Sequence, residues 1–494
     1  MRLKLGLLGA ALLAAEPTSA QESPPRLSAL RLEPPTLAQG WAKPTATGLR
    51  AVGSAQGQDS LPCWDCDRAR QAWPAFGEWT LGMWTAWAFN RFLREGDVGD
   101  ISLNQWLTSW RGRWDWDPNG FVVNQIGHPL QGATYFNGYR TNGYSFWTAS
   151  AMTLVGSFVW ECCGEKNLPA VNDLLTTWIG GTGVGEITRR LSDAVLDNEA
   201  RGAERFWREA GAFAVNPVRG FDRIVRGHAH RVGANPPDAR PHNYRASVVT
   251  GALALGTNRT GETQWLTGAK LAGRVVYGDP SQLTEAPFST FEVDFELTSI
   301  PGAPLYFMRS EGNLWGKVLR RQATGTDWLL SSHLRYDYVR SRAFEIGAQS
   351  VTFGVERDYM LFKKVRVTAG TRLRAIPIAA VEDDFQPPSD EGRNYDYTYG
   401  GGLELQTSFT FPNDFRVRTR SSQTALRVID GVATSHVLER QEFLLDAPLG
   451  HRTRFEAGLR YQTRRSYFAD QPRTRAYAPE FWLGLAINPP RWRR

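Results

Sequence analysis

Residues 291–298 read Phe-Glu-Val-Asp-Phe-Glu-Leu-Thr, and this stretch decides the fold. Its odd-numbered positions are all apolar, and its even-numbered positions are Glu, Asp, Glu and Thr. Because successive side chains of a β-strand point to opposite faces, the stretch predicts a strand with one apolar and one charged face. The same alternation recurs in residues 365–373, 403–409 and 454–461. A soluble sandwich would also show it, so the number and the length of the segments have to decide.

The chain from residue 244 onward contains twelve such segments. They start near residues 244, 264, 287, 304, 325, 343, 361, 394, 413, 433, 450 and 475. Most are longer than ten residues, and a tilted strand crosses a bilayer in about 9–11 residues. An even strand number is typical of bacterial outer-membrane barrels, in which both ends of the sheet lie on the periplasmic side.

The predicted fold class is therefore an α+β membrane protein. An N-terminal helical domain is followed, over residues 241–494, by a C-terminal antiparallel transmembrane β-barrel of about 12 strands. The connections near 376–393 and 465–474 are long, as expected for outer loops, whereas those near 412–414 and 446–450 are short. The alternative is a soluble β domain.

The first twenty residues predict a secretory signal peptide, residues 1–20. Arg2 and Lys4 precede a short apolar core, and small residues follow at 18–20. The apolar core is too short to span a bilayer, although an uncleaved anchor is the alternative. Residues 21–65 are rich in Pro, Ala, Ser, Gly and Gln, which predicts a flexible periplasmic leader. Export then predicts an outer-membrane location, with the N-terminal part periplasmic or inside the barrel lumen.

The composition suits a membrane protein better than a nucleic-acid-binding one. The formal net charge is +7, but no run of basic residues forms a phosphate-tracking patch, so nucleic acid is not expected as a partner. The chain contains 19 Trp, 15 Tyr and 25 Phe. Aromatic rings concentrate at membrane–water boundaries, so outer-membrane lipids are the expected neighbours.

Four cysteines are present. In an oxidising compartment, Cys63 and Cys66 predict a small disulfide loop. Cys162 and Cys163 could instead pair with them, and the sequence leaves the connectivity open. A four-thiolate zinc site is disfavoured, because neighbouring residues seldom both reach one tetrahedral ion.

Residues 66–240 predict a mainly helical domain. Its apolar stretches, residues 73–93, 144–160 and 174–187, are diluted by Gly, Ser and Thr. Such small residues allow helices to pack closely, although inner-membrane spans are an alternative. Because a barrel follows in the chain, we expect these helices to pack against the barrel or inside it, as a plug or a periplasmic domain.

The densest set of polar residues lies in this helical part. It comprises Asn124, His128-Pro129, Gly132, Arg140, Gly143, Trp160-Glu161, Glu165, Pro169, Asp173 and Gly185-Glu186. In its order and spacing the set resembles the DUF3943 family of uncharacterised bacterial proteins, over roughly residues 105–220. Ala170 departs from the Ser of the family pattern, and Cys162-Cys163 from its aromatic residues. The resemblance implies an envelope protein and no known activity.

These residues allow three interpretations. Glu161 and Glu165 share a helix face, and with His128 and Asp173 they could act as acid and base or bind a metal. No nucleophile motif and no His-x-x-x-His spacing accompanies them. The interpretation that we favour is a structural network. In it Arg140, Arg189 and Arg190 neutralise Glu161, Glu165, Asp173 and Glu186, since buried charges are costly unless paired. No cofactor and no metal site is therefore predicted.

The inward faces of the predicted strands carry charges of both signs. They are Arg366, Arg372, Arg374, Arg416, Arg418, Arg420, Arg454 and Arg460, beside Glu292, Asp294, Glu296, Glu404 and Glu456. Opposite charges in a modest barrel can pair across it and hold it shut, which is the expectation that we prefer. The surplus of Arg could instead favour an anionic solute or glycan.

The sequence thus predicts a non-enzymatic outer-membrane barrel protein for transport across the cell envelope or for its organisation. Its helical domain would plug or gate the barrel, and an envelope partner protein is possible. The alternative is an outer-membrane enzyme that acts on lipid or glycan, with His128 and Glu161 as acid and base.

Overall fold

The computed structural model describes most of the chain beyond residue 60. The described residues are 61–64, 66, 69–92, 101–102, 104, 112–237, 239, 243–258, 263–279, 286–301, 305–321, 327–341 and 344–488. The predicted signal peptide and nearly all of the predicted leader lie outside these residues. Cys63 and Cys66 lie within them and form a disulfide, whereas Cys162 and Cys163 are not disulfide-bonded.

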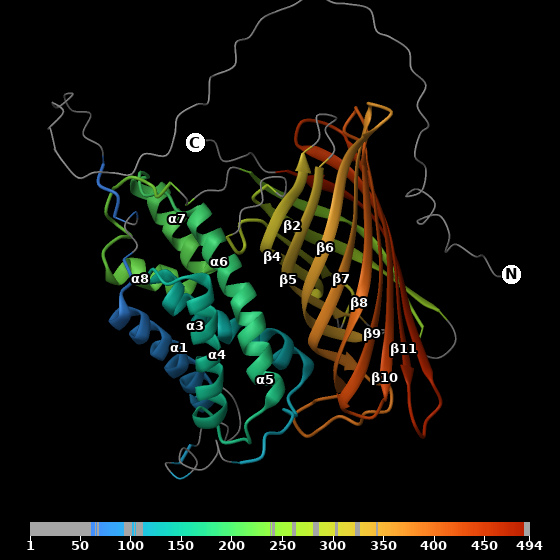
Figure 1. Cartoon of the computed structure of the whole chain (residues 1–494), viewed down its shortest axis with the longest axis horizontal. Coiled ribbons are helices and arrows are strands. Elements are labelled where there is room, and N and C mark those ends of the chain that lie inside the picture. The colour runs from blue at the N-terminus through green and yellow to red at the C-terminus, as the bar shows by residue number, and fades with distance from the viewer. Residues whose placement is uncertain are drawn as a thin grey trace, which may run out of the picture. The chain divides into compact units, whose positions relative to one another are not determined.

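The first part of the described chain is helical, as predicted (Figure 1). Its elements are α1 (Ala72–Phe92), η3 (Val123–Gly127), α3 (His128–Thr141), α4 (Phe146–Cys163), α5 (Val171–Leu175), η4 (Thr176–Gly180), α6 (Gly181–Val195), α7 (Gly202–Val215) and α8 (Pro217–Val225). None of the described helices has both the length and the apolar character that a membrane crossing requires.

Local sequence signals set several helix starts. The Ser145 side chain accepts a hydrogen bond from the Thr148 backbone N–H at 3.1 Å and so caps α4. Asn216 caps α8 in the same way, with Pro217 in the first turn, where its missing N–H costs nothing. These helices then pack on one another through α3, which contacts α1, α4 and α6.

The second part is a closed antiparallel β-barrel, which confirms the prediction. Its strands are β1 (Tyr244–Thr257), β2 (Gln264–Tyr277), β3 (Phe291–Thr298), β4 (Leu305–Arg321), β5 (Asp327–Arg340), β6 (Glu345–Leu361), β7 (Val365–Glu382), β8 (Tyr395–Thr410), β9 (Arg416–Asp430), β10 (Ser435–Pro448), β11 (Thr453–Tyr467) and β12 (Thr474–Ile487). Each strand pairs with its sequence neighbours, and β1 pairs with β12, with Val248 opposite Ile487. Closure leaves no strand edge with unpaired backbone groups.

The ion pairs show which face of the wall is the lumen. Arg335 on β5 binds Glu404 on β8, although β6 and β7 separate these strands in the wall. Arg460 on β11 likewise binds Glu296 on β3, with β12, β1 and β2 between them. Such contacts can only cross the interior, so these charged side chains line the lumen. Their neighbours along each strand point outward, because side chains alternate.

The helical domain contacts the outer face of this wall. Tyr336, which alternates with the lumen residue Arg335, donates a hydrogen bond to the carbonyl oxygen of Gln125 in η3. Gln349 on β6 is also outward-facing, and its Nε2 donates to the Thr176 carbonyl oxygen at 3.2 Å. The helices that carry these acceptors therefore lie outside the lumen.

Further side chains of the barrel contact the helical domain. Tyr395 and Tyr397, at the start of β8, accept hydrogen bonds from the Asn124 side chain, both at 2.8 Å. Phe288, just before β3, packs on Phe146 of α4, with ring centroids 5.6 Å apart. Of the two expected arrangements, helices packed against the barrel or inside it, these contacts of the described residues match packing against the outer face, where outward tyrosines provide the contact surface.

Candidate functional site

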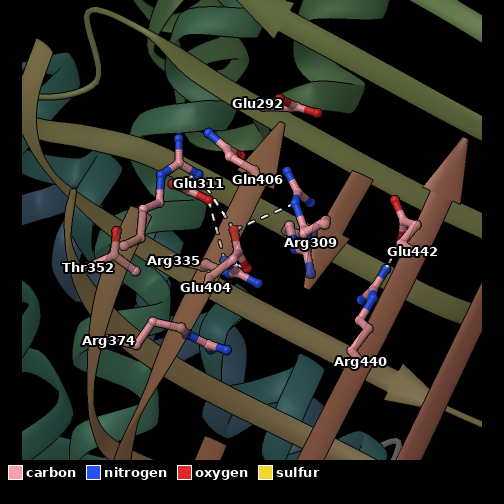
Figure 2. Close-up of polar contacts among 12 residues, drawn as sticks. Glu292, Arg309, Glu311, Arg335, Thr352, Arg374, Glu404, Gln406, Arg440 and Glu442 are labelled. Carbon is pink, nitrogen blue, oxygen red and sulfur yellow. Dashed lines mark hydrogen bonds and ion pairs between the residues drawn. The ribbon is translucent and has the colours of Figure 1, made fainter. Parts of the chain in front are cut away.

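Two groups of buried polar side chains could serve a function, one in the lumen and one inside the helical domain. In the lumen, ion pairs converge on Glu404 (Figure 2) and on Asp337. Asp337 binds Arg335 at 2.8 Å, Arg374 at 2.7 Å and Arg309 at 2.9 Å. These partners come from β4, β5 and β7, so the network ties several strands together.

Glu404 lies at the centre of the view in Figure 2. Its Oε2 is 2.7 Å from Nη1 of Arg335, and its Oε1 is 3.8 Å from Nη1 of Arg372. Arg372 in turn binds Glu311 on β4 at 2.9 Å. Each carboxylate therefore faces at least one guanidinium, which is the condition for keeping such charges buried.

A second set of ion pairs meets at Arg460. Its guanidinium binds Glu296 and Glu480, both at 2.7 Å, and Glu442 at 3.1 Å. Lys270 lies 3.1 Å from Glu296 and stacks over the Trp482 ring at 3.8 Å from its centroid. These side chains come from β2, β3, β10, β11 and β12, so they also span the lumen.

Apolar side chains fill more of the same interior. The largest buried apolar cluster draws residues from β1, β4, β5, β10 and β12, strands that are not all neighbours in the wall. Its members include Leu253, Leu255, Tyr306, Phe307, Val339, Leu444 and Trp482. Arg440 and Arg460 both lie over the Phe307 ring, at 4.5 and 4.9 Å from its centroid. The lumen is therefore a packed core with ionic and apolar parts.

The structure separates the predicted lumen charges into two groups. Arg372, Arg374, Glu404 and Arg460 belong to the buried networks, and Glu456 accepts a hydrogen bond from the Trp482 indole at 2.9 Å. Arg454 instead binds Asp414 and Asp446 beside the short turns. Arg366 is largely exposed and pairs with Asp358.

The predicted lumen set missed Lys270, Arg309, Glu311, Arg335, Asp337, Arg440, Glu442 and Glu480. The alternation in β5 could have found two of them, since Arg335 and Asp337 alternate with Leu334, Tyr336 and Tyr338. No sequence signal specifies which of these charges meet across the lumen.

The polar set of the helical domain forms two clusters that are chemically different. In the first cluster, Glu186 on α6 forms ion pairs with three arginines. The N···O distance is 2.8 Å to Arg140 and Arg190 and 3.6 Å to Arg189. Burial alone would raise the pKa of Glu186, but the three guanidinium groups outweigh it and hold that pKa below its usual range. Arg189 also reaches Asp193, at 3.6 Å. This is a neutralised structural cluster.

The second cluster contains His128, Asp173, Glu161 and Glu165, together with Asp117. Nε2 of His128 is 3.2 Å from Oδ1 of Asp173. Burial raises the pKa of both Glu161 and Asp173 well above the usual range, and nearby carboxylates raise it further. The arginines that were expected to neutralise these two acids bind Glu186 instead. The structural network that the sequence suggested is thus divided into a basic and an acidic half.

The remaining residues of the set support the packing. Gly132 on α3 lies against Gly181 on α6, so closely that a Cβ at Gly132 would be 1.9 Å from the Thr177 carbonyl oxygen. A Cβ at Gly185 would be 2.6 Å from the Phe136 ring, and Gly143 adopts a φ of 81° that favours glycine. Trp160 is buried in α4, where its ring lies over Gly164. Asn124 holds the two barrel tyrosines described above.

Comparison with protein families identifies one match. Residues 113–218 match the model of the domain of unknown function DUF3943, which confirms the resemblance for that part of the chain. A comparison with curated proteins gives no match.

Solved structures give weak similarities to bacterial porins and channels. An anion-selective porin from Comamonas acidovorans has 7% identity and a TM-score of 0.23, covering 50% of this chain and 99% of its own. The NanC porin has 10% identity and a TM-score of 0.27, covering 47% and 98%. An outer membrane channel from Pseudomonas putida F1 has 12% identity and a TM-score of 0.28, covering 50% and 96%. We draw no functional conclusion from similarities this weak.

Proposed function

We propose that this chain is an integral β-barrel protein of the bacterial outer membrane without enzymatic activity. It serves transport across the cell envelope or the organisation of the envelope, and the lumen of its barrel is closed at rest. One observation carries the proposal, the opposite character of the two faces of the wall. On β12, Phe481 and Leu485 are each 46% exposed, whereas Glu480, which directly precedes Phe481, is fully buried. This is the reverse of a soluble protein.

The exposed apolar side chains extend around much of the barrel. They include Val248, Trp265, Leu271, Phe295, Leu319, Phe353, Leu373, Leu403, Leu405, Phe443, Leu459, Leu483 and Ile487. Monomeric soluble proteins rarely expose a contiguous apolar surface of this kind, whereas lipid-facing barrel strands require it. Outer-membrane lipids are therefore the expected neighbours of this belt.

Passage of a solute would require the lumen to open. The buried networks around Glu404 and Arg460 link strands on different sides of the barrel, and removing one partner of a buried pair costs about 3–5 kcal/mol. A resting barrel should therefore conduct little. Because several arginines meet in the lumen, an anionic solute or glycan is the cargo to test first.

Conductance in planar lipid bilayers tests this proposal. Wild-type protein should insert into the bilayer and show little steady current. The double variant Arg335→Ala with Glu404→Ala should raise the current, because it removes both partners of a central cross-lumen pair, and the reversal potential in a KCl gradient would report the preferred ion. The matched control is Arg366→Ala with Asp358→Ala, an exposed pair outside the buried networks, which should behave as wild type.

Two results would contradict the proposal. A wild-type protein with the steady current of an open pore would refute the closed lumen. Failure of purified, folded protein to insert into lipid would refute the membrane location. The burial of His128, Glu161 and Asp173 argues against the enzymatic alternative, because these side chains offer little surface to a lipid or glycan.

A further inference from the structure

Five side chains, four of them carboxylates, converge inside the helical domain. Two groups of side chains have their possible ligand atoms within 4.8 Å of one another. One group is Asp117, His128 and Asp173, and the other is Glu161, Glu165 and Asp173. The two groups share Asp173, so the five residues surround one region. They come from separate parts of the domain, because Asp117 precedes η3, His128 begins α3, Glu161 lies on α4 and Asp173 on α5.

One oxygen of Glu161 points to a missing ligand. Oε2 of Glu161 accepts a hydrogen bond from the Ala170 backbone N–H at 2.9 Å. Oε1 has no hydrogen-bond partner among the described residues, although the Glu161 side chain is fully buried. An unsatisfied buried carboxylate oxygen is costly, and native structures rarely keep one without a proton, a water molecule or an ion.

His128 is oriented for metal binding. Its Nδ1 lies 3.2 Å from the Thr177 hydroxyl, and its Nε2 lies 3.2 Å from Asp173. Histidine ligands usually have their second ring nitrogen held by such a neighbour, which fixes the ring and the tautomer. Asp173 is in turn held by Asn172, whose Nδ2 donates to Oδ1 at 2.6 Å.

Carboxylates meet closely in this cluster. Oxygens of Asp173 lie within 4.8 Å of oxygens of Asp117, Glu161 and Glu165. Like charges so close together cannot all remain ionised in a buried site unless a proton or a cation joins them. Arg140 and Arg190 of the motif bind Glu186.

We propose that this cluster is a divalent transition-metal site, with His128, Asp173, Glu161 and Asp117 as ligands and Glu165 at its margin. A ligand set of one imidazole nitrogen and several carboxylate oxygens suits Mn²⁺, Fe²⁺ or Zn²⁺. Mg²⁺ and Ca²⁺ prefer sites made of oxygen ligands alone. The site goes beyond the proposed function and does not depend on conduction.

The position of Asp117 gives the site a structural role. The backbone N–H of Asp117 donates to Asn172 at 2.9 Å, and its carbonyl oxygen accepts from the Tyr397 hydroxyl of the barrel at 3.0 Å. Asp117 therefore stands between α5 and the outer wall. An ion bound there would fasten the segment that joins the helical domain to β8.

Metal content provides the test. Full-length protein purified in detergent is treated with EDTA, and Mn²⁺ or Zn²⁺ alone is then added and followed by calorimetry and elemental analysis. Wild type should take up a single ion per chain in a saturable way. His128→Ala and Glu161→Gln should each weaken binding by at least about 100-fold, and Thr177→Val, which removes only the hydroxyl beside His128, by about 10–100-fold.

Asp193→Asn is the matched control, because this buried carboxylate of the same domain is already held by Arg219 at 2.9 Å. Its metal uptake should equal that of wild type. Absence of saturable uptake by wild type would overturn the proposal, as would unchanged uptake by the folded His128 and Glu161 variants. If those variants fail to fold, X-ray absorption of zinc-loaded wild type decides: a first shell with one imidazole supports the site, and a shell without imidazole overturns it.

Discussion

Gly132 shows how closely the helices of this chain approach one another. Its backbone lies against Gly181 of α6, and each of the two positions leaves no room for a Cβ. Small residues at such crossings allow the backbones to come together. The small residues in the sequence predict close helix packing. They do not predict which glycines lie against each other, because that depends on how α3 and α6 cross.

Gly132→Ala should destabilise the helical domain by about 1–3 kcal/mol, because the added methyl group would overlap the Thr177 carbonyl oxygen. Gly77→Ala on α1 is the control, since a Cβ there meets nothing within 4 Å. That change should be neutral or stabilising by about 0.5–1 kcal/mol. Denaturant unfolding followed by tryptophan fluorescence measures both, and equal effects of the two substitutions would contradict the packing argument.

At the scale of the element, α6 depends on the ion pairs of Glu186. This carboxylate on α6 joins Arg140 of α3 to Arg190 of its own helix. The pKa of Glu186 is lowered by these guanidinium groups, so the group is more acidic in the folded domain than in the unfolded chain. Its contribution to stability is therefore complete above the unfolded pKa and is lost as the pH falls through the lower folded value.

We expect the free energy of unfolding of the helical domain to decrease as the pH drops below about 4.3, the ordinary pKa of Glu. Glu186→Gln should remove this part of the pH dependence and cost about 3–5 kcal/mol at neutral pH, because three arginines lose their partner. Unfolding curves recorded between neutral and acidic pH measure both effects. Glu204→Gln, at a largely exposed carboxylate on α7, should follow the wild-type curve, and a Glu186→Gln curve parallel to wild type would refute the assignment.

The strands could be predicted because a two-residue period depends only on neighbours in the sequence. Each of the twelve expected segments contains a strand, although β3 begins at Phe291 instead of near residue 287. At Phe288 the backbone leaves the extended conformation, with a φ of 56°, and the ring packs on Phe146 of α4. The acidic cluster was predicted only in part. Asp117 precedes the predicted polar set in the sequence, and its meeting with His128 depends on how residues 112–120 fold over α5.

At the scale of the whole molecule, the sequence predicts a wall with two faces but not where the helices dock. Tyr336 and Tyr338 occupy the same outward positions as the apolar residues of other strands, so the two-residue period cannot tell a lipid-facing position from one that binds a helix. What distinguishes Tyr336 is a hydroxyl that needs a partner, which it finds in Gln125.

The lipid-facing belt predicts a depth-dependent response to charge. Phe481→Arg, near the middle of β12, should cost about 2–4 kcal/mol of barrel stability, because the arginine would enter the hydrocarbon. Ile487→Arg, at the end of the same strand, should cost about 0–1 kcal/mol, because it lies near the interface. Reversible unfolding in lipid vesicles provides the comparison. Equal costs at the two positions would argue that the belt does not face a bilayer.

The pairing of Val248 with Ile487 has a consequence for how the barrel can assemble. The first and last strands meet at a seam, so the cylinder is finished only when the most distant parts of its sequence have found each other. Loop closure over such a long sequence distance slows folding. Until it occurs, the unpaired backbone N–H and C=O groups of the first and last strands can pair with other chains. During biogenesis the edges of the first and last strands have to be shielded until these strands pair. Before that pairing the protein is most prone to aggregate.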